Sequence, residues 1–177
     1  CERHGCRPLA VATALTEQTT EGLRAVNPVD PAIVREQLIA LLSDIELAAV
    51  KIGMLGSVAM AEVVAEALAM TAAPIVWDPV ARASHGATAL SPDELGAAAG
   101  ALGASCALLT PNAGVELAGP RLAGASVHGT GCALSTAIAC ELARGAALAD
   151  ACRAAKAFVA ARIAAPVRPG RGRAAIV

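Results

Sequence analysis

Aromatic side chains are almost absent from this chain of 177 residues, which has no tyrosine, one tryptophan and one phenylalanine. Hydrophobic residues nevertheless make up 56% of the sequence, so the core must be built from Ala, Val, Leu and Ile. Small side chains of this kind let helices and sheets approach one another closely. A chain of this length is typical of one domain with a sizeable core.

Long hydrophobic runs are also missing. The longest apolar stretch, residues 96–109, is shorter than the ~20 residues that a transmembrane helix needs. The sequence begins with polar residues, which predicts no signal peptide. The six cysteines form no CxxC pair and show no Cys/His spacing typical of a zinc site. We therefore expect a cytoplasmic protein with reduced cysteines.

Positive charge is sparse as well. The net charge is −1, and basic residues cluster only at 168–173. This distribution gives little electrostatic support for nucleic-acid binding, and we expect neither a nucleic acid nor a membrane as a partner. We expect one domain over residues 1–165, followed by a flexible basic tail over 166–177.

Apolar runs and helix-capping signals predict strands that alternate with helices. The expected strands span residues 9–15, 48–54, 75–77 and 106–109. The expected helices follow Asp30-Pro31, Gly56-Ser57 and Ser91-Pro92, and the last two span 131–144 and 148–164. This alternation predicts an α/β fold with a mainly parallel sheet covered by helices on both faces, in three layers. Ligands of such sheets bind beyond the carboxyl ends of the strands.

A glycine loop at residues 127–135 is the strongest candidate for chemistry. Gly129 and Gly131 free the backbone to turn, and an apolar run of helical character follows. The unpaired N–H groups of a helix amino end favour an anion, and Cys132 lies in the first turn, where a thiolate is stabilised. A purely structural loop-to-helix junction would give the same pattern. The dinucleotide-binding and Walker A patterns both fail here.

Asp78, Asn112 and Glu116 are candidate ligands for a metal or for phosphate. Asp78 follows a predicted strand, but an ordinary turn aspartate also fits that position. Asn112 and Glu116 stand four residues apart, a spacing that suits a hydrated Mg²⁺. A capped short helix with a solvated glutamate is the other interpretation.

Three further polar residues lie near the predicted strand ends. Lys51 lies inside a strand run, either at an edge or buried with a partner, and we favour a structural role. Gln18 has the donors and acceptors to bind the edge of a heterocycle, or it is a solvated turn residue. His128 precedes the glycine loop, although a loop histidine is more often incidental.

Taken together, these segments resemble the hydroxymethylpyrimidine/phosphomethylpyrimidine kinases of thiamine biosynthesis, which belong to the ribokinase-like superfamily. The resemblance covers most of residues 9–163. The stretches that carry it follow the family's order: TALTEQTT at 13–20, AVKIGMLGS at 49–57, WDPV at 77–80 with SHG at 84–86, TPN at 110–112, and HGTGCALS at 128–135.

The resemblance implies a ribokinase-like fold, a homodimer, and ATP-dependent phosphorylation of 4-amino-5-hydroxymethyl-2-methylpyrimidine and its monophosphate, with Mg²⁺. It also implies a role for each motif residue. The residues expected to contact the pyrimidine are Gln18, Met54 and Val80. The anion hole for the transferred phosphoryl group would be Gly129, Thr130 and Gly131, with Cys132 as the base. Asp78 and Asn112 would lie near Mg²⁺ and the phosphates, and Glu116 would be a metal ligand.

The chain also departs from the family pattern. It lacks the family's first strand and glycine-rich substrate loop, and a second segment near 119–120. We expect both segments to belong to the protein, because deletion of a sheet strand would expose apolar surface and unpaired backbone. The spacing from Asn112 to Glu116 is one residue longer than the family's Asn-x-x-Glu.

Two alternatives remain open. Pyridoxal kinase shares the fold, and some dual-activity relatives use a lid cysteine to trap the aldehyde. The candidate lid at residues 80–88 has no cysteine, which argues against that activity. The other alternative is a non-catalytic ligand-binding descendant of the fold.

Overall fold

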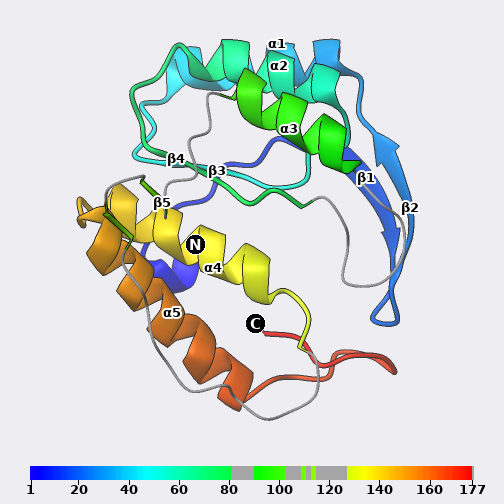
Figure 1. Ribbon diagram of the computed structural model, residues 1–177, viewed down its shortest axis with the longest axis vertical. Coiled ribbons are helices and arrows are strands. Elements are labelled where there is room, and N and C mark those ends of the chain that lie inside the picture. Colours follow the sequence, from blue (N-terminus) through cyan, green and yellow to red (C-terminus); the bar gives the residue numbers. More distant parts are fainter. Residues whose placement is uncertain (81–89, 103–108, 111–112, 115–126, 177) are drawn as a thin grey trace.

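The computed structural model describes residues 1–80, 90–102, 109–110, 113–114 and 127–176, and these form three layers (Figure 1). The middle layer is the pair of strands β3 (Val50–Ile52) and β4 (Ile75–Trp77). The helices of one outer layer are α1 (Pro31–Asp44), α2 (Val58–Leu68) and α3 (Pro92–Ala101). The helices of the other are α4 (Thr130–Ala143) and α5 (Leu148–Ala164). The α/β class expected from the sequence is confirmed.

Strands β3 and β4 run parallel, with Lys51 opposite Val76. Parallel neighbours need a crossover connection, which α2 supplies. The N–H of Asp78 donates to the carbonyl of Ile52 at 2.9 Å and continues the pairing past the end of β4. The residues that follow both strands therefore meet at one edge of the sheet.

The other strand pairs among the described residues are antiparallel. They are β1 (Ala14–Gln18) with β2 (Leu23–Pro28), and β5 (Leu109–Thr110) with β6 (Ala113–Gly114). A short 3₁₀ turn, η1 (Glu2–His4), precedes them.

The first strand lies further along the chain than the sequence predicted. We expected a strand over 9–15 and a polar turn over 16–20, but Thr16 and Glu17 lie within β1, and β2 was not predicted. Four of the five residues of β1 are exposed, so the strand has no buried face to mark it in the sequence. Polar residues in a row are compatible with such an exposed hairpin, and the polar-turn prediction was wrong.

Side-chain caps fix the starts of three helices as predicted. Asp30 caps α1, and Ser57 caps α2 by accepting a hydrogen bond from the N–H of Met60 at 3.1 Å. Ser91 and Glu94 form a reciprocal capping box at the start of α3. Hydrogen bonds from Ser91 lower the pKa of the Glu94 carboxyl. These contacts span few residues, which is why the sequence pattern predicts them.

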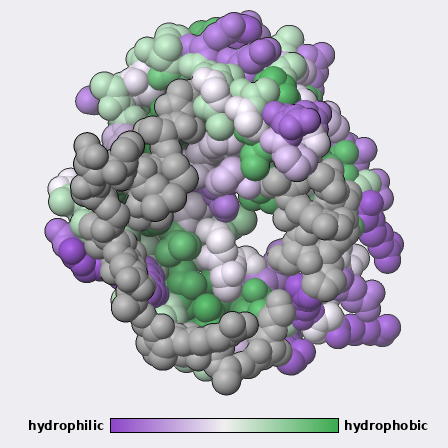
Figure 2. Space-filling view, in the orientation of Figure 1, coloured by the Kyte–Doolittle hydropathy of each residue, from purple (hydrophilic) through white to green (hydrophobic). Residues whose placement is uncertain are grey.

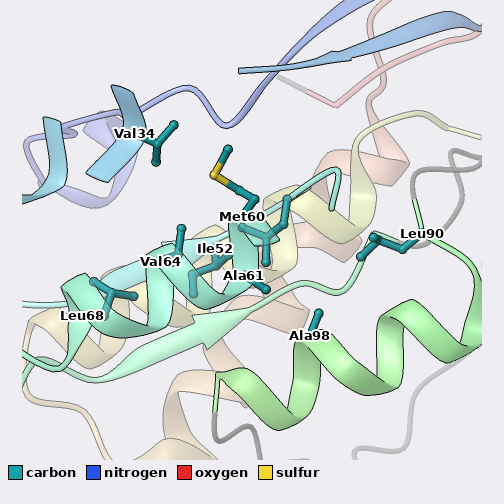
Figure 3. Packing of buried hydrophobic residues seen from close by; sticks show 9 residues of the cluster. Val34, Ile52, Met60, Ala61, Val64, Leu68, Leu90 and Ala98 are labelled. Carbon is teal, nitrogen blue, oxygen red and sulfur yellow. The ribbon is translucent and has the colours of Figure 1, made fainter. Parts of the chain in front are cut away.

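The larger core lies between the sheet and the layer of α1, α2 and α3 (Figure 3). Its labelled members come from all three helices, from β3 and from the residue two positions before α3: Val34, Ile52, Met60, Ala61, Val64, Leu68, Leu90 and Ala98. Alanines dominate the smaller core between α4 and α5, where Ala137, Ala151 and Ala155 are fully buried. These small side chains allow the two helices to pack closely, as composition predicted.

The end of the chain folds back onto the domain. Val167 and Ala175 exchange two backbone hydrogen bonds, of 2.9 and 2.8 Å. The N–H of Gly172 donates to Thr20 Oγ1 at 3.0 Å, and a Cβ at Gly172 would lie 2.3 Å from the Thr20 carbonyl oxygen. The expected flexible end over 166–177 is thus tied to the turn of the β1–β2 hairpin, although the domain limits themselves stay a prediction.

No helix within the described ranges is long and apolar enough to span a bilayer.

Replacing Met60 by Ala should destabilise the protein by about 3 kcal/mol, because the side chain is fully buried and its loss leaves a cavity. The same change at Met70, which is 60% exposed just after α2, should stay within about 0.5 kcal/mol of wild type. Urea denaturation of both variants measures the difference. Equal costs at the two positions would contradict the packing of α2 between α1 and α3 over the sheet.

Candidate active site

Four side chains meet where the carboxyl ends of β3 and β4 face the amino end of α4. Asp78, which follows β4, is at the centre of this group. Lys51 Nζ lies 4.0 Å from Asp78 Oδ2, and Ser135 Oγ lies 3.3 Å from the same oxygen. Cys132 forms a side-chain hydrogen bond with Asp78. We call Lys51, Asp78, Cys132 and Ser135 the Asp78 cluster. Figure 2 shows the surface hollowed at this place, between the α1–α3 layer and α4.

The amino end of α4 has the geometry of an anion hole. Gly129 is the N-cap residue with φ +86°, a left-handed conformation that glycine adopts without strain. The first backbone hydrogen bond of the helix runs from the N–H of Ala133 to the carbonyl of Gly129 at 2.9 Å. The N–H groups of Thr130, Gly131 and Cys132 therefore have no acceptor inside the helix. They point toward the space in front of α4, where the helix dipole favours negative charge.

Asp78 occupies part of that space. A Cβ built at Gly131 would lie 3.8 Å from Asp78 Oδ2, which places the carboxylate beside the first turn of α4. The dipole of α4 and the ammonium of Lys51 both stabilise this carboxylate. Any phosphate that binds to the same N–H groups must share the site with it.

The Cys132 thiol is not the stabilised thiolate that its helix position predicts. The residue as a whole is exposed, yet its sulfur is partly shielded by its neighbours, and this desolvation raises the pKa of Cys132 above its ordinary value. Lys51 lowers the pKa, whereas the charge and hydrogen bond of Asp78 raise it. Burial and the nearby carboxylate outweigh the helix end, so the expectation of a lowered pKa was wrong.

Gln18 and His128 lie together on the other side of the glycine loop. Gln18 Nε2 is 3.1 Å from His128 Nε2, which joins the end of β1 to the residue before the loop. The backbone of His128 is held in turn by the C-terminal segment, through hydrogen bonds with Ala174 and Ile176 of 2.8 and 3.2 Å. The structure thus gives His128 a specific partner that its sequence position did not indicate.

Met54 and Val80 follow β3 and β4, so they lie at the same edge as the Asp78 cluster. Both residues are half-buried. Thr13 Oγ1 donates to the Met54 carbonyl at 2.6 Å, and the N–H of Val80 donates to the Asp78 carbonyl at 2.8 Å. The predicted contacts of Met54 and Val80 with a pyrimidine stay predictions.

Asn112 and Glu116, the other two candidate ligands, lie outside the described residues. The described part of the chain holds no group of three or more His, Cys, Asp or Glu side chains that could hold a metal. Among the residues that the structure describes, Asp78 is the one that offers a carboxylate to this site. One carboxylate suits a Mg²⁺ ion that keeps several waters and binds mainly through substrate phosphates.

Sequence reasoning missed the parts that Lys51 and Ser135 play in the site. Ser135 is the one buried polar residue of the described chain, at 7% exposure, and its hydroxyl lies 3.1 Å from the carbonyls of both Gly131 and Cys132. A serine on the buried face of an apolar helix was the available signal. One of the two interpretations of Lys51, a buried position with a partner, agrees with the contact to Asp78. The sequence alone could not identify Asp78 as that partner.

Known proteins show which family this site belongs to. A family model described as phosphomethylpyrimidine kinase matches residues 1–115 and 113–176. The hydroxymethylpyrimidine/phosphomethylpyrimidine kinase of Streptomyces coelicolor is 31% identical over 220 residues, covering 95% of this chain and 82% of that protein. This chain belongs to the phosphomethylpyrimidine kinase family. The same-named enzyme of Rhizobium meliloti is also 31% identical, covering 93% of this chain and 83% of its own length.

Solved structures confirm the ribokinase-like fold. Phosphomethylpyrimidine kinase from Clostridium difficile superposes with a TM-score of 0.65 at 23% identity, covering 92% of this chain and 89% of that chain. An ADP complex of Bacillus subtilis pyridoxal kinase superposes with a TM-score of 0.73 at 21% identity, covering 93% of this chain and 83% of that chain. These similarities concern the fold alone.

Membership of the family confirms the predicted phosphotransferase activity on hydroxymethylpyrimidine and its monophosphate. The alignment of 220 residues with the Streptomyces coelicolor enzyme is longer than the chain, so that enzyme has residues without a counterpart here. The two segments of this chain that match the family model overlap at residues 113–115. The missing segment expected near 119–120 stays a prediction, since 115–126 lie outside the described residues.

Alkylation of Cys132 should respond in opposite directions to its two charged neighbours. Asp78→Asn removes the charge and acceptor that raise the pKa of Cys132, so it should speed the reaction with iodoacetamide at pH 7.5. Lys51→Met removes the cation that lowers this pKa, so it should slow the reaction. Peptide mass spectrometry measures both rates, with the exposed Cys1 as an internal reference. A change in the same direction for both variants would contradict the arrangement.

The two glycines of the loop should respond differently to Ala. Gly129→Ala places a side chain at φ +86° and should cost about 1–2 kcal/mol. Gly131→Ala should fold at least as well as wild type, because its Cβ would meet Asp78 only at an ordinary contact distance of 3.8 Å. Thermal melting separates the two. A large loss of stability in Gly131→Ala would contradict this geometry of the first turn of α4.

Proposed function

We propose that phosphoryl transfer from ATP to the pyrimidine takes place at the amino end of α4, beside the Asp78 cluster. The main observation in support is that the N–H groups at the start of α4, Cys132 and Asp78 face the same space at the carboxyl edge of the sheet. A helix amino end is a natural phosphate site, and carboxyl edges of α/β sheets are where ligands bind. Family membership supports this assignment of the reaction.

The anion hole stabilises the charge that develops on the transferred group. The N–H groups at 129–132 are fixed by the loop geometry before substrate arrives, so no reorganisation is needed during transfer. A well-placed donor of this kind is worth about 3 kcal/mol of transition-state stabilisation in other enzymes. Mg²⁺ would supply positive charge that neutralises part of the charge on the phosphates of ATP. Asp78, together with Asn112, would hold it there.

Cys132 acts as the base. Its thiolate accepts the proton of the attacking hydroxyl or phosphate while the new P–O bond forms to the γ-phosphorus of ATP, the bond from that phosphorus to the oxygen of ADP breaks, and ADP leaves. Because the pKa of the free thiol is raised, little thiolate exists at neutral pH, and turnover should increase as the pH rises into the alkaline range. The positive charges of Lys51 and of the bound metal favour the thiolate when the site is filled.

The pyrimidine would lie between the glycine loop and the ends of β1, β3 and β4. Gln18, with a donor and an acceptor in its amide, would bind the ring's polar edge while His128 orients it. Met54 and Val80 would contact the ring as half-buried apolar side chains. We also propose a homodimer that works in the cytoplasm, as the membership of the family implies.

Cys132→Ala should fold normally and lose most phosphoryl transfer, at least a hundredfold, because it removes the base while Lys51 and Ser135 still hold Asp78. The assay compares ATP consumption with the pyrimidine alcohol, its monophosphate and pyridoxal as acceptors. Cys152→Ala, a buried cysteine on α5, serves as the matched control for loss of a thiol. Turnover of Cys132→Ala near the wild-type level would refute the base assignment, and a preference for pyridoxal would refute the substrate.

A further inference from the structure

Lys51 has an unusual position for a lysine in the middle layer of an α/β fold. It lies on β3, and its side chain is only 23% exposed. The ammonium bends over Gly53: a Cβ built at Gly53 would lie 2.9 Å from Lys51 Nζ. A side chain at residue 53 would therefore force the Lys51 ammonium to shift from this position. From there it reaches Asp78, which is 22% exposed, at 4.0 Å.

The charges at the amino end of α4 do not favour phosphate unless Lys51 is included. The helix end is equivalent to about half a positive charge. Asp78 adds one negative charge beside the first turn, so the two together are net negative. The ammonium of Lys51 reverses the sign. A phosphate that approaches the helix N–H groups then meets a net positive site.

We propose that Lys51 is a phosphate-positioning residue of this kinase: acting through Asp78, and with room provided by Gly53, it makes the amino end of α4 attractive to a substrate phosphate. The inference rests on the proposed function and goes beyond it, because it explains how an anion hole and a carboxylate share one place. It also gives the lysine of the AVKIGMLGS stretch a chemical role, whereas the sequence favoured a structural one.

A purely structural salt bridge makes a different prediction. Such a salt bridge would only help to hold β3 and the residue after β4 in place, and its loss would weaken the binding of all ligands alike. A charge that offsets Asp78 affects only ligands that carry a phosphate. The pyrimidine alcohol and its monophosphate differ in that group alone, so the ratio of their affinities isolates the effect of charge.

The experiment measures both affinities by calorimetry, without ATP or metal, for wild type and three variants. In Lys51→Met the affinity for the monophosphate should fall at least about tenfold relative to the affinity for the alcohol, as expected when a unit charge a few ångströms away is removed. In Asp78→Asn the ratio should move the other way. The double variant, which combines Lys51→Met with Asp78→Asn, has the same net charge as wild type. Its affinity ratio should therefore lie within a few-fold of the wild-type ratio. Lys156→Met, on α5, is the matched control and should leave the ratio unchanged.

Gly53→Ala tests the geometry without touching a charge. Its methyl group displaces the Lys51 ammonium, so the ratio of monophosphate affinity to alcohol affinity should fall part of the way toward the ratio of Lys51→Met. If Lys51→Met does not fold, Gly53→Ala is the variant that tests the inference. An unchanged ratio in Lys51→Met, or an equal loss for both ligands, overturns the inference while the proposed function stands. A wild-type protein that binds neither ligand overturns the proposed function and the inference with it.

Discussion

The Asp78 carboxylate is the contact on which the arrangement of the site depends. It is one residue past β4, pairs with Lys51 of β3, and bonds to Ser135 and Cys132 of α4. A half-buried carboxylate needs several partners, and here the partners come from two elements, β3 and α4. The same interactions that satisfy this charge therefore fix the position of α4 against the edge of the sheet.

Local signals in the sequence predict the frame of the fold well, because the interactions behind them span few residues. Caps such as Asp30 and the Ser91–Glu94 box mark helix starts from within one turn. The β1–β2 hairpin leaves no such signal, since its exposed strands lack the alternation that a buried face imposes. The contact of Thr20 with Gly172 joins residues 152 positions apart, which no local pattern contains.

The candidate site shows the same division between local and distant interactions. The glycine loop and the place of Cys132 in the first turn follow from the sequence alone. The charge state of Cys132 does not, because burial, Asp78 and Lys51 decide it, and the last two come from strands far away in the chain. A rule derived from one helix end gives the wrong sign when a carboxylate from another element lies in front of that end.

Two separate links hold the glycine loop, one on each side. Asp78 ties the start of α4 to the sheet, while His128 ties the residue before the loop to Gln18 and to the C-terminal segment. The phosphate side of the site is thus positioned by the parallel strands, and the pyrimidine side by the hairpin and the tail. Because the tail also bonds to the hairpin turn at Thr20, a movement of the hairpin must strain the tail and with it His128. The anion hole, which begins at the residue after His128, is held on its other side by the contact of Asp78 with Ser135 of α4.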